Sequence, residues 1–441
     1  MKKKSTSWFQ KLQKKALTLW QDPQHFQTLV FWISAFLASL VSVTYAGLFK
    51  MAEGFYLDLY AHHPALIWLW TPLCLLAAWA LVAFLAPEAS GSGIPQVLAA
   101  NDLNYKTQRA WVDRLLSLKG VGIKIASSLL SSLGGTVTGR EGPTIQVSAG
   151  IFHGIGRLFR RFQTRADASA WIVAGAAAGL ASAFNTPLGG IVFAVEEMSV
   201  HFKRFRTVLI SSIVIAGLVS QWILGSYLYL GHPDVGDVPF SSLLPALGVG
   251  LVSGAFGAFY GMCIKWLLNW RDRLKTKVQC GILALVCGLA MAALALFNPH
   301  TSGSGLEIIN ALLFKGEKSE WYLPFLRAAG SLVFYVSGAA GGIFAPALAA
   351  GACTGSVLAS WFHSDSANLL ILSGMVGFLT GVTRTPFTAF VLVVEMTDHH
   401  AAIFPIMLSA LAAELVARRL DKESFYEWAR KRFMPPGPSR R

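Results

Sequence analysis

An ionisable pair stands between two apolar runs, in the sequence GREGP at residues 139–143. The pattern predicts that Arg140 and Glu141 lie at the start of a broken helix. A carboxylate at a helix N-terminus occupies the place that an anion would take. Glu141 could therefore compete with an anion, and protonation of Glu141 would release the site. In the alternative, Glu141 caps the helix and pairs with Arg140.

Two adjacent glutamates, Glu196 and Glu197, follow the apolar run PLGGIVFAV. Adjacent carboxylates repel each other, so one of them binds a proton more readily than an isolated glutamate. The basic residues after His201 place the pair near the cytoplasmic face of a membrane. Glu196 has a counterpart in an internal repeat, which favours a structural role, whereas Glu197 has none. The pattern predicts proton exchange at Glu197; the alternative is a solvated helix end.

A glycine-rich turn, GSGIP at residues 91–95, offers uncharged donors. Its glycines let the backbone approach a ligand closely, and Pro95 suits the first turn of a helix. The hydroxyl of Ser92 and the N–H groups from Gly93 onward could bind an anion. A site without fixed charge releases a small anion quickly. The alternative is a plain loop turn.

A second such turn, GIFAP at residues 342–346, is the apolar counterpart of GREGP. It places the N–H groups of Ile343 and Phe344 at a helix start, where anions bind. Phe344 stands where the first motif has Glu141. One motif could carry a gate while the other completes the anion site; a buried apolar turn is an equally good interpretation.

Three blocks of sequence recur in the same order. GSG at 91–93 returns at 303–305, and GREGP aligns with GIFAP. In the third block Gly175, Leu180, Thr186, Pro187, Val192, Val195 and Glu196 align with Gly374, Leu379, Thr385, Pro386, Val391, Val394 and Glu395. The order predicts two homologous halves, which in transporters are often inverted in the membrane. We expect a cytoplasmic amphipathic segment at 1–27, membrane repeats at 28–230 and 231–430, and a basic cytoplasmic tail at 431–441.

The elements that position these motifs are apolar. Of the 441 residues 54% are hydrophobic and only 14% are charged, against about 25% charged in soluble proteins. The net charge is +14, but the basic residues form short runs between apolar segments, as in cytoplasmic loops, which argues against a nucleic-acid partner. The runs are Lys2–Lys4, Arg157–Arg165, Lys203–Arg206 and Lys265–Lys277.

Five apolar runs are long enough, or nearly so, to span a bilayer. They are Thr28–Leu48, Leu66–Leu85, Val208–Leu228, Leu243–Ile264 and Gly281–Phe297. Other runs, such as Ile343–Val357, are shorter and interrupted. Broken helices at membrane depth survive only where they line a wet cavity or are buried in protein. Residues 5–25 can form an amphipathic helix on the inner membrane surface; a basic tail is the alternative.

The interruptions favour a transporter or channel over a membrane-embedded enzyme. Neither HExxH nor GxSxG occurs, and the five cysteines show no CxxC spacing. We therefore expect no enzyme activity, no metal site and no cofactor.

The set GSGIP, GREGP and GIFAP, with FNTPLGGIVFAVEEM and its echo RTPFTAFVLVVEMTD, resembles the CLC family of chloride channels and chloride/proton antiporters over about residues 28–430. The resemblance implies an all-α polytopic membrane protein with two inverted-topology repeats and many broken or re-entrant helices. It also implies a homodimer in the bilayer with one pathway per subunit.

The resemblance also assigns roles to single residues. Ser92, with the N–H groups of Ile343 and Phe344, would bind the central chloride. Glu141 would be the external gate and proton site, and Glu197 the internal proton-transfer residue. Tyr426 is the best candidate for the tyrosine that closes the inner side of the site.

The same resemblance separates the functional alternatives. An acid at Glu197 is typical of antiporters, and serine at Ser92 of chloride-preferring members. Gln96 departs from the glutamate of many relatives, with little expected effect. We expect a chloride/proton antiporter of prokaryotic type in the inner or plasma membrane, with both termini cytoplasmic. A passive voltage- or pH-gated chloride channel is the alternative.

Overall fold

The structure is a computed structural model that describes residues 23–159, 168–198, 206–225, 228–236, 238–362 and 366–435. The amphipathic helix expected over residues 5–25 lies outside the described residues except for its last three positions. Most of the basic tail expected at 431–441 also lies outside them.

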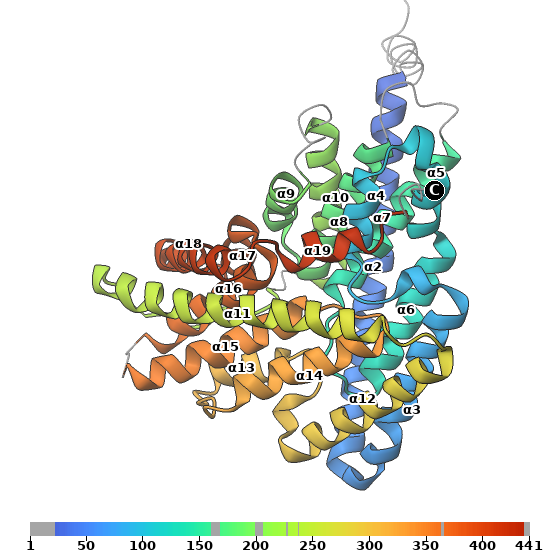
Figure 1. The fold of residues 1–441 in the computed structure, drawn as a ribbon. Helices are drawn as coiled ribbons and strands as arrows, with labels where there is room; N and C mark the ends of the chain where they lie inside the picture. Colours follow the sequence, from blue (N-terminus) through green and yellow to red (C-terminus); the bar gives the residue numbers. More distant parts are fainter. Residues whose placement is uncertain are drawn as a thin grey trace, which may run out of the picture.

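The described chain is helical, and its extended backbone is limited to two isolated bridges (Figure 1). The helices up to the middle of the chain are α2 Pro23–His62, α3 Ile67–Leu85, α4 Ile94–Asp102, α5 Tyr105–Leu115, α6 Leu118–Leu133, α7 Glu141–Leu158, α8 Ala168–Phe184, α9 Pro187–Glu196 and α10 Arg206–Leu224. The later helices are α11 Leu243–Arg271, α12 Lys277–Phe297, α13 Leu306–Phe314, α14 Leu323–Ser337, α15 Phe344–Trp361, α16 Ala367–Thr383, α17 Pro386–Thr397, α18 Ile403–Leu420 and α19 Phe425–Lys431. Short 3-10 turns are η1 Pro64–Leu66, η2 Pro87–Ala89, η4 Phe240–Ser242, η5 Pro299–Thr301 and η6 His400–Ala402.

Within the described residues, six helices are long and apolar enough to cross a membrane, at residues 25–62, 64–85, 206–224, 240–271, 277–297 and 344–361. Four of the first five contain the runs predicted from sequence in full, and the third, α10, contains most of its run. Helix α10 ends at Leu224, before the predicted end at Leu228, because Gly225 takes a positive φ of 77° that breaks the helix. The sixth, α15, extends four residues beyond the interrupted run Ile343–Val357.

Helices with a lipid-facing side differ from those inside the protein. Helices α3 and α12 expose large apolar side chains, among them Leu69, Phe84 and Ile282. Helices α8, α15 and α16 are buried on nearly every side, as expected for helices that are apolar all round. Small residues allow this burial: a Cβ on Gly351 of α15 would lie 2.4 Å from the Gly374 carbonyl oxygen of α16.

The aligned blocks of sequence form helices of equal or similar length. Helices α4 and α13 are both 9 residues long, α7 and α15 both 18, and α8 and α16 both 17. Helices α9 and α17 both begin at a Thr–Pro pair and pack on each other. Helices α13, α15, α16 and α17 therefore start where the sequence alignment places the partners of α4, α7, α8 and α9.

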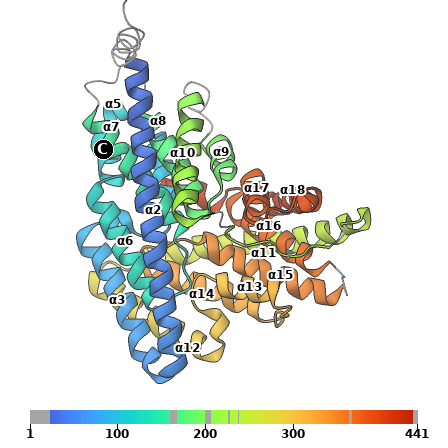
Figure 2. The ribbon, with the colours of Figure 1, turned by 180° about the vertical axis from the view of Figure 1, so that it is seen from behind.

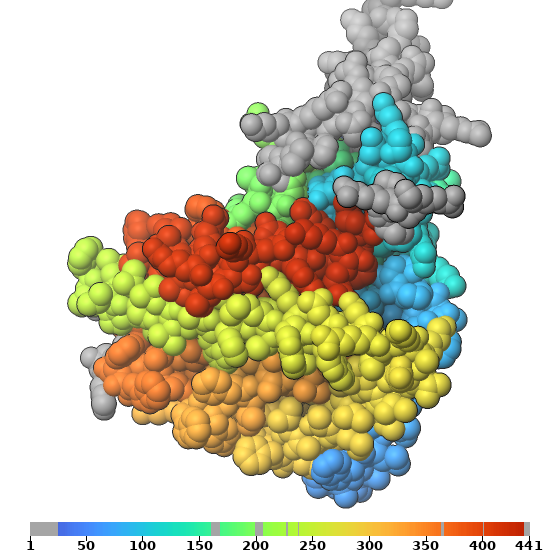
Figure 3. Space-filling view, in the orientation of Figure 1, coloured from blue at the N-terminus to red at the C-terminus, as the bar shows by residue number. Residues whose placement is uncertain are grey.

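The two halves lie mainly on different sides of the molecule. Figures 1 and 2 show α2 beside α6 and α10 on one side, and α15–α18 extending to the other. Helices α18 and α19 lie along α11 across one face (Figure 3). Helix α12 returns to the first half and packs on α3.

Candidate functional site

Backbone pairing brings the starts of three helices together. Gly139 and Gly342 exchange two hydrogen bonds, each N–H donating to the carbonyl of the other, at 2.8 and 2.7 Å. The loop before α4 joins them: the Gly91 N–H donates to the Ala339 carbonyl at 3.0 Å, and the Gly341 N–H donates to the Gly91 carbonyl at 3.1 Å. Helices α4, α7 and α15 thus begin beside one another, and their partial positive charges combine.

Two glycines permit the close approach of α4 and α7. A Cβ on Gly142 would lie 2.3 Å from Ser92 Oγ. A Cβ on Gly93, whose φ is +106°, would lie 2.7 Å from the Gly142 carbonyl oxygen. Neither distance leaves room for a side chain, so GSGIP and GREGP touch only because these positions are glycine.

The hydroxyls of Ser92 and Tyr426 lie in this region. Ser92 is fully buried and Tyr426 is 2% exposed. Tyr426 is held by α19, which begins at a capping box between Ser424 and Glu427. The two hydroxyls are close enough to interact, yet neither has a hydrogen-bond partner within 3.5 Å among the described residues. Buried polar groups are nearly always paired, so both hydroxyls are available to a small anion.

Two backbone amides complete the set of uncharged donors. Ile343 and Phe344 begin α15 and are 1% and 3% exposed. The first N–H groups of a helix have no partner inside it, and no described residue accepts from either amide. They lie next to Gly342, and therefore next to the start of α7.

Glu141 is the first residue of α7 and is fully buried. The Tyr229 hydroxyl donates to its Oε1 at 3.3 Å, and its Oε2 has no partner among the described residues. The carboxylate folds back over Gly139, because a Cβ there would lie 2.3 Å from Oε2.

The neighbouring Arg140 does not form an ion pair with Glu141. Within the described residues, no side-chain nitrogen of Arg140 lies within 4.0 Å of the Glu141 carboxylate. Arg140 instead donates from Nη1 to the Ala46 carbonyl of α2 at 2.6 Å, and lies 5.9 Å from the centre of the Tyr229 ring. The interpretation in which Glu141 pairs with Arg140 is therefore wrong, and the carboxylate is held by Tyr229.

Glu197 lies apart from Glu141, directly after α9. It makes no hydrogen bond among the described residues, and the nearest charges are those of Glu427, Glu196, Arg430 and Asp102. Arg430 pairs with Asp102 at 2.7 Å, which joins α19 to α4. Since α19 also carries Tyr426, one short helix connects Glu197 to the hydroxyl beside Ser92.

Its neighbour Glu196 has a different environment. The Glu196 carboxylate accepts hydrogen bonds from the N–H groups of Phe387 and Thr388 at 3.1 and 2.7 Å, and thus caps α17. Its repeat partner Glu395 accepts from the N–H groups of Leu188 and Gly189 at 3.0 and 2.8 Å, and caps α9. These reciprocal caps agree with the structural role predicted for Glu196.

Sequence reasoning missed several residues around the site. Lys124 is fully buried and donates from Nζ to the Gly91 carbonyl at 2.9 Å. The Tyr335 hydroxyl accepts from the Ser92 N–H at 3.2 Å. A lysine directly before an apolar run was a signal for Lys124, because charges inside membrane segments are usually functional. Neither Tyr335 nor Tyr229 stands in a motif.

The structure also shows a role for Gln96, the position at which the sequence departs from the family pattern. Gln96, in the first turn of α4, donates from its side-chain amide to the carbonyls of Glu88 and Ser90 at 3.1 and 2.6 Å. It therefore holds the loop that precedes GSG, and an ionised glutamate could not donate these bonds.

The fold and the cluster of helix starts define a multi-span helical membrane protein that transports anions. The model of the voltage gated chloride channel family matches residues 73–418. The chain therefore belongs to this family, the CLC proteins, which are transporters and channels rather than enzymes.

Solved structures show the same fold. A slow cyanobacterial Cl−/H+ antiporter is 27% identical, with a TM-score of 0.77 over 91% of this chain and 97% of that chain. A CLC-type fluoride/proton antiporter is 22% identical, with a TM-score of 0.75 over 96% of this chain and 98% of that one. A eukaryotic CLC transporter is also 22% identical, with a TM-score of 0.70 over 92% of this chain and 73% of that one. The all-helical, multi-span fold predicted from the sequence is thereby confirmed.

Proposed function

We propose that this CLC protein exchanges chloride for protons. The observation that supports the proposal is that two carboxylates lie near one set of uncharged donors, Glu141 at the cluster of helix starts and Glu197 close enough to Tyr426 to interact with it. Glu141 lies where α7 begins, and Glu197 lies in the charged cluster beside α19. A passive pore needs only these donors, whereas a proton-coupled cycle needs a proton acceptor toward each side of the membrane.

In this proposal the anion binds between the Ser92 and Tyr426 hydroxyls and the N–H groups of Ile343 and Phe344, with Gly93 leaving room for it. All these groups are neutral donors, so chloride exchanges hydration for hydrogen bonds without being trapped by a full charge. The serine at Ser92 supports chloride as the preferred anion, because that residue is typical of chloride-preferring members of the family.

Glu141 would be the gate and the external proton site. Ionised, its carboxylate competes with chloride for the positive ends of α7 and α15. Protonated, it is neutral and leaves the pathway, so each gate opening carries a proton. Glu197 would exchange that proton with the inner solution, and the Tyr426 hydroxyl would limit anion passage on the same side.

We further propose a homodimer in the inner or plasma membrane, with both termini cytoplasmic. One pathway per subunit follows from this arrangement, because all the donors named above come from a single chain.

Proton flux into liposomes tests the proposal. Purified protein is reconstituted under a chloride gradient, the voltage is clamped with valinomycin and potassium, and internal pH is followed. We expect outward chloride movement to drive protons inward against their gradient. Glu141→Gln and Glu197→Gln should both abolish proton movement while chloride still passes. Glu414→Gln, which alters a surface pair with Arg418, should leave both fluxes unchanged.

Two outcomes would contradict the antiporter function or the gate role of Glu141. Chloride flux without proton flux in the unmodified protein would favour the passive channel and leave Glu197 as a helix end. Proton coupling that persists in Glu141→Gln would contradict the gate assignment.

A further inference from the structure

Tyr229 is the side chain that holds the Glu141 carboxylate. It lies in the connection between α10 and α11, is 5% exposed, and donates from its hydroxyl to Glu141 Oε1 at 3.3 Å. Neighbouring side chains help to fix its ring. Phe184 of α8 meets it edge to face with ring centres 5.0 Å apart, and the Arg140 guanidinium lies 5.9 Å from its centre. The hydroxyl is therefore preorganised toward the carboxylate.

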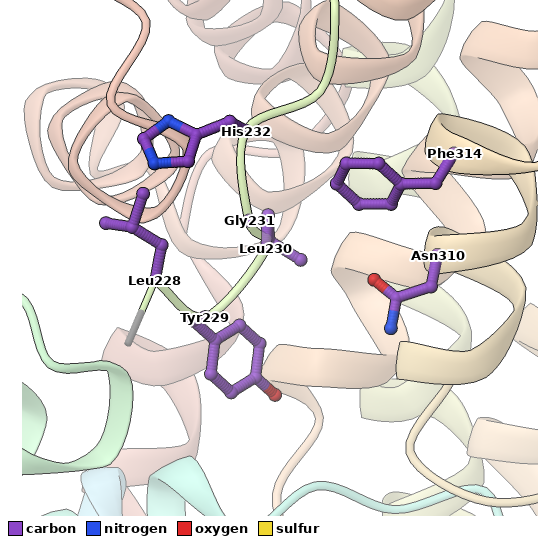
Figure 4. A pocket seen from close by; sticks show the side chains of 7 residues that line it. All are labelled: Leu228, Tyr229, Leu230, Gly231, His232, Asn310 and Phe314. Carbon is purple, nitrogen blue, oxygen red and sulfur yellow. The ribbon is translucent and has the colours of Figure 1, made fainter. Parts of the chain in front are cut away.

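Tyr229 also lines a hollow on the protein. The hollow has a volume of about 450 Å³ and is lined by Leu228, Tyr229, Leu230, Gly231, His232, Asn310 and Phe314 (Figure 4). In Figure 4 the Tyr229 ring lies below His232 and Phe314, with its hydroxyl directed away from His232. The residue thus borders this hollow and, through its hydroxyl, also contacts Glu141.

We propose that Tyr229 is a positioning residue for the gate: its hydroxyl stabilises the ionised Glu141 carboxylate in the anion pathway and opposes its protonation from the hollow. The proposal rests on the proposed function of Glu141. A hydroxyl donor stabilises a carboxylate more than a neutral carboxyl group, because the acceptor of the bond is then charged. Tyr229 therefore sets the pH at which the gate opens.

Other groups near Glu141 also affect the balance between its ionised and its protonated form. Arg140 favours the ionised carboxylate, whereas Glu53 of α2 opposes it. Tyr45, also of α2, interacts with Glu141, but its hydroxyl bonds to Ser128 at 2.6 Å. Among the described residues, Tyr229 supplies the one side-chain hydrogen bond to the carboxylate.

The pH profile of chloride flux in Tyr229→Phe tests the proposal. This change removes the hydroxyl and keeps the ring between Phe184 and Arg140, so the fold should persist; elution of the purified variant as a single peak checks this. Losing one hydrogen bond to a charged acceptor should move the midpoint of the profile toward alkaline pH by about 0.5–1 unit. Tyr60→Phe is the matched control, because its hydroxyl donates to the remote Ala295 carbonyl, and its profile should not move.

A double variant separates this inference from the gate assignment. In a Glu141→Gln background no carboxylate remains to titrate, so adding Tyr229→Phe should not shift the profile. If Glu141→Gln abolishes the pH dependence but Tyr229→Phe alone leaves the midpoint unchanged, the gate stands and the role of Tyr229 is refuted. If Glu141→Gln keeps the full pH dependence, the gate assignment fails, and the proposed role of Tyr229 with it.

Discussion

The adjacent residues Glu196 and Glu197 should respond to mutation in opposite ways. The Glu196 carboxylate bonds to the Phe387 N–H and to both the N–H and the hydroxyl of Thr388, the last at 2.6 Å. Glu197 makes no hydrogen bond among the described residues. We therefore expect Glu196 to matter for stability and Glu197 for proton movement.

The magnitude follows from the number and kind of these bonds. Loss of a helix cap costs about 0.5–2 kcal/mol, and a charge at a helix N-terminus adds about 0.3–1 kcal/mol. With three bonds lost, Glu196→Ala should destabilise the protein by roughly 2–3 kcal/mol. Glu395→Ala, which loses two bonds, should cost roughly 1–2 kcal/mol. Because α9 and α17 pack on each other, the double variant should cost less than the sum.

Thermal denaturation in detergent, followed by circular dichroism, measures the first effect. The apparent melting temperature of Glu196→Ala should fall by roughly 2–3 °C, and that of Glu197→Ala should change little. Liposome assays measure the second: Glu196→Gln should keep proton coupling, and Glu197→Gln should lose it. Unchanged melting of Glu196→Ala, or lost coupling in Glu196→Gln, would refute the division of roles.

Two further substitutions probe the donors around the anion. Gly142→Ala places a methyl group 2.3 Å from Ser92 Oγ; it should separate α7 from α4 and lower chloride affinity by roughly tenfold or more, measured by isothermal titration calorimetry. Lys124→Met removes the donor to the Gly91 carbonyl at 2.9 Å, which helps to hold the loop before α4; it should weaken chloride binding by roughly tenfold in the same assay, and unchanged affinity would exclude a part for Lys124 at the site.

Local sequence patterns determined much of the fold. Apolar runs of membrane length became α2, α3, α10, α11 and α12. Glycine–proline motifs marked helix starts because only glycine tolerates the close approaches seen at Gly93 and Gly142. The repeat identified Glu196 and Glu395, because a helix cap that occurs in both halves places the same residue at the aligned position of each half. These features depend on neighbouring residues or on duplication, and both are visible without a structure.

The contacts that hold the gate could not be predicted in the same way. Tyr229 and Glu141 are 88 residues apart, and Tyr335 and Ser92 are 243 apart. Such pairs form only when the packing of whole helices brings them together, and a tyrosine in an apolar run resembles any core aromatic residue. Only the burial and hydrogen bonds of the folded chain distinguish Tyr229 from its neighbours.

The duplicated halves differ at the positions where an anion could bind. In the first half the Ser92 hydroxyl has no partner among the described residues. In the second half the matching Ser304 donates its N–H to the Glu53 carboxylate of α2 at 2.6 Å. A carboxylate of the chain thus occupies the start of α13, where an outside anion would otherwise compete for the same N–H groups. The start of α15 differs from that of α13, because Phe344, which stands where the first half has Glu141, brings no charge that would compete for its N–H groups. Of the paired helix starts, α13 is thus closed by a carboxylate of the chain, whereas those of α4 and α15 keep uncharged donors for an anion.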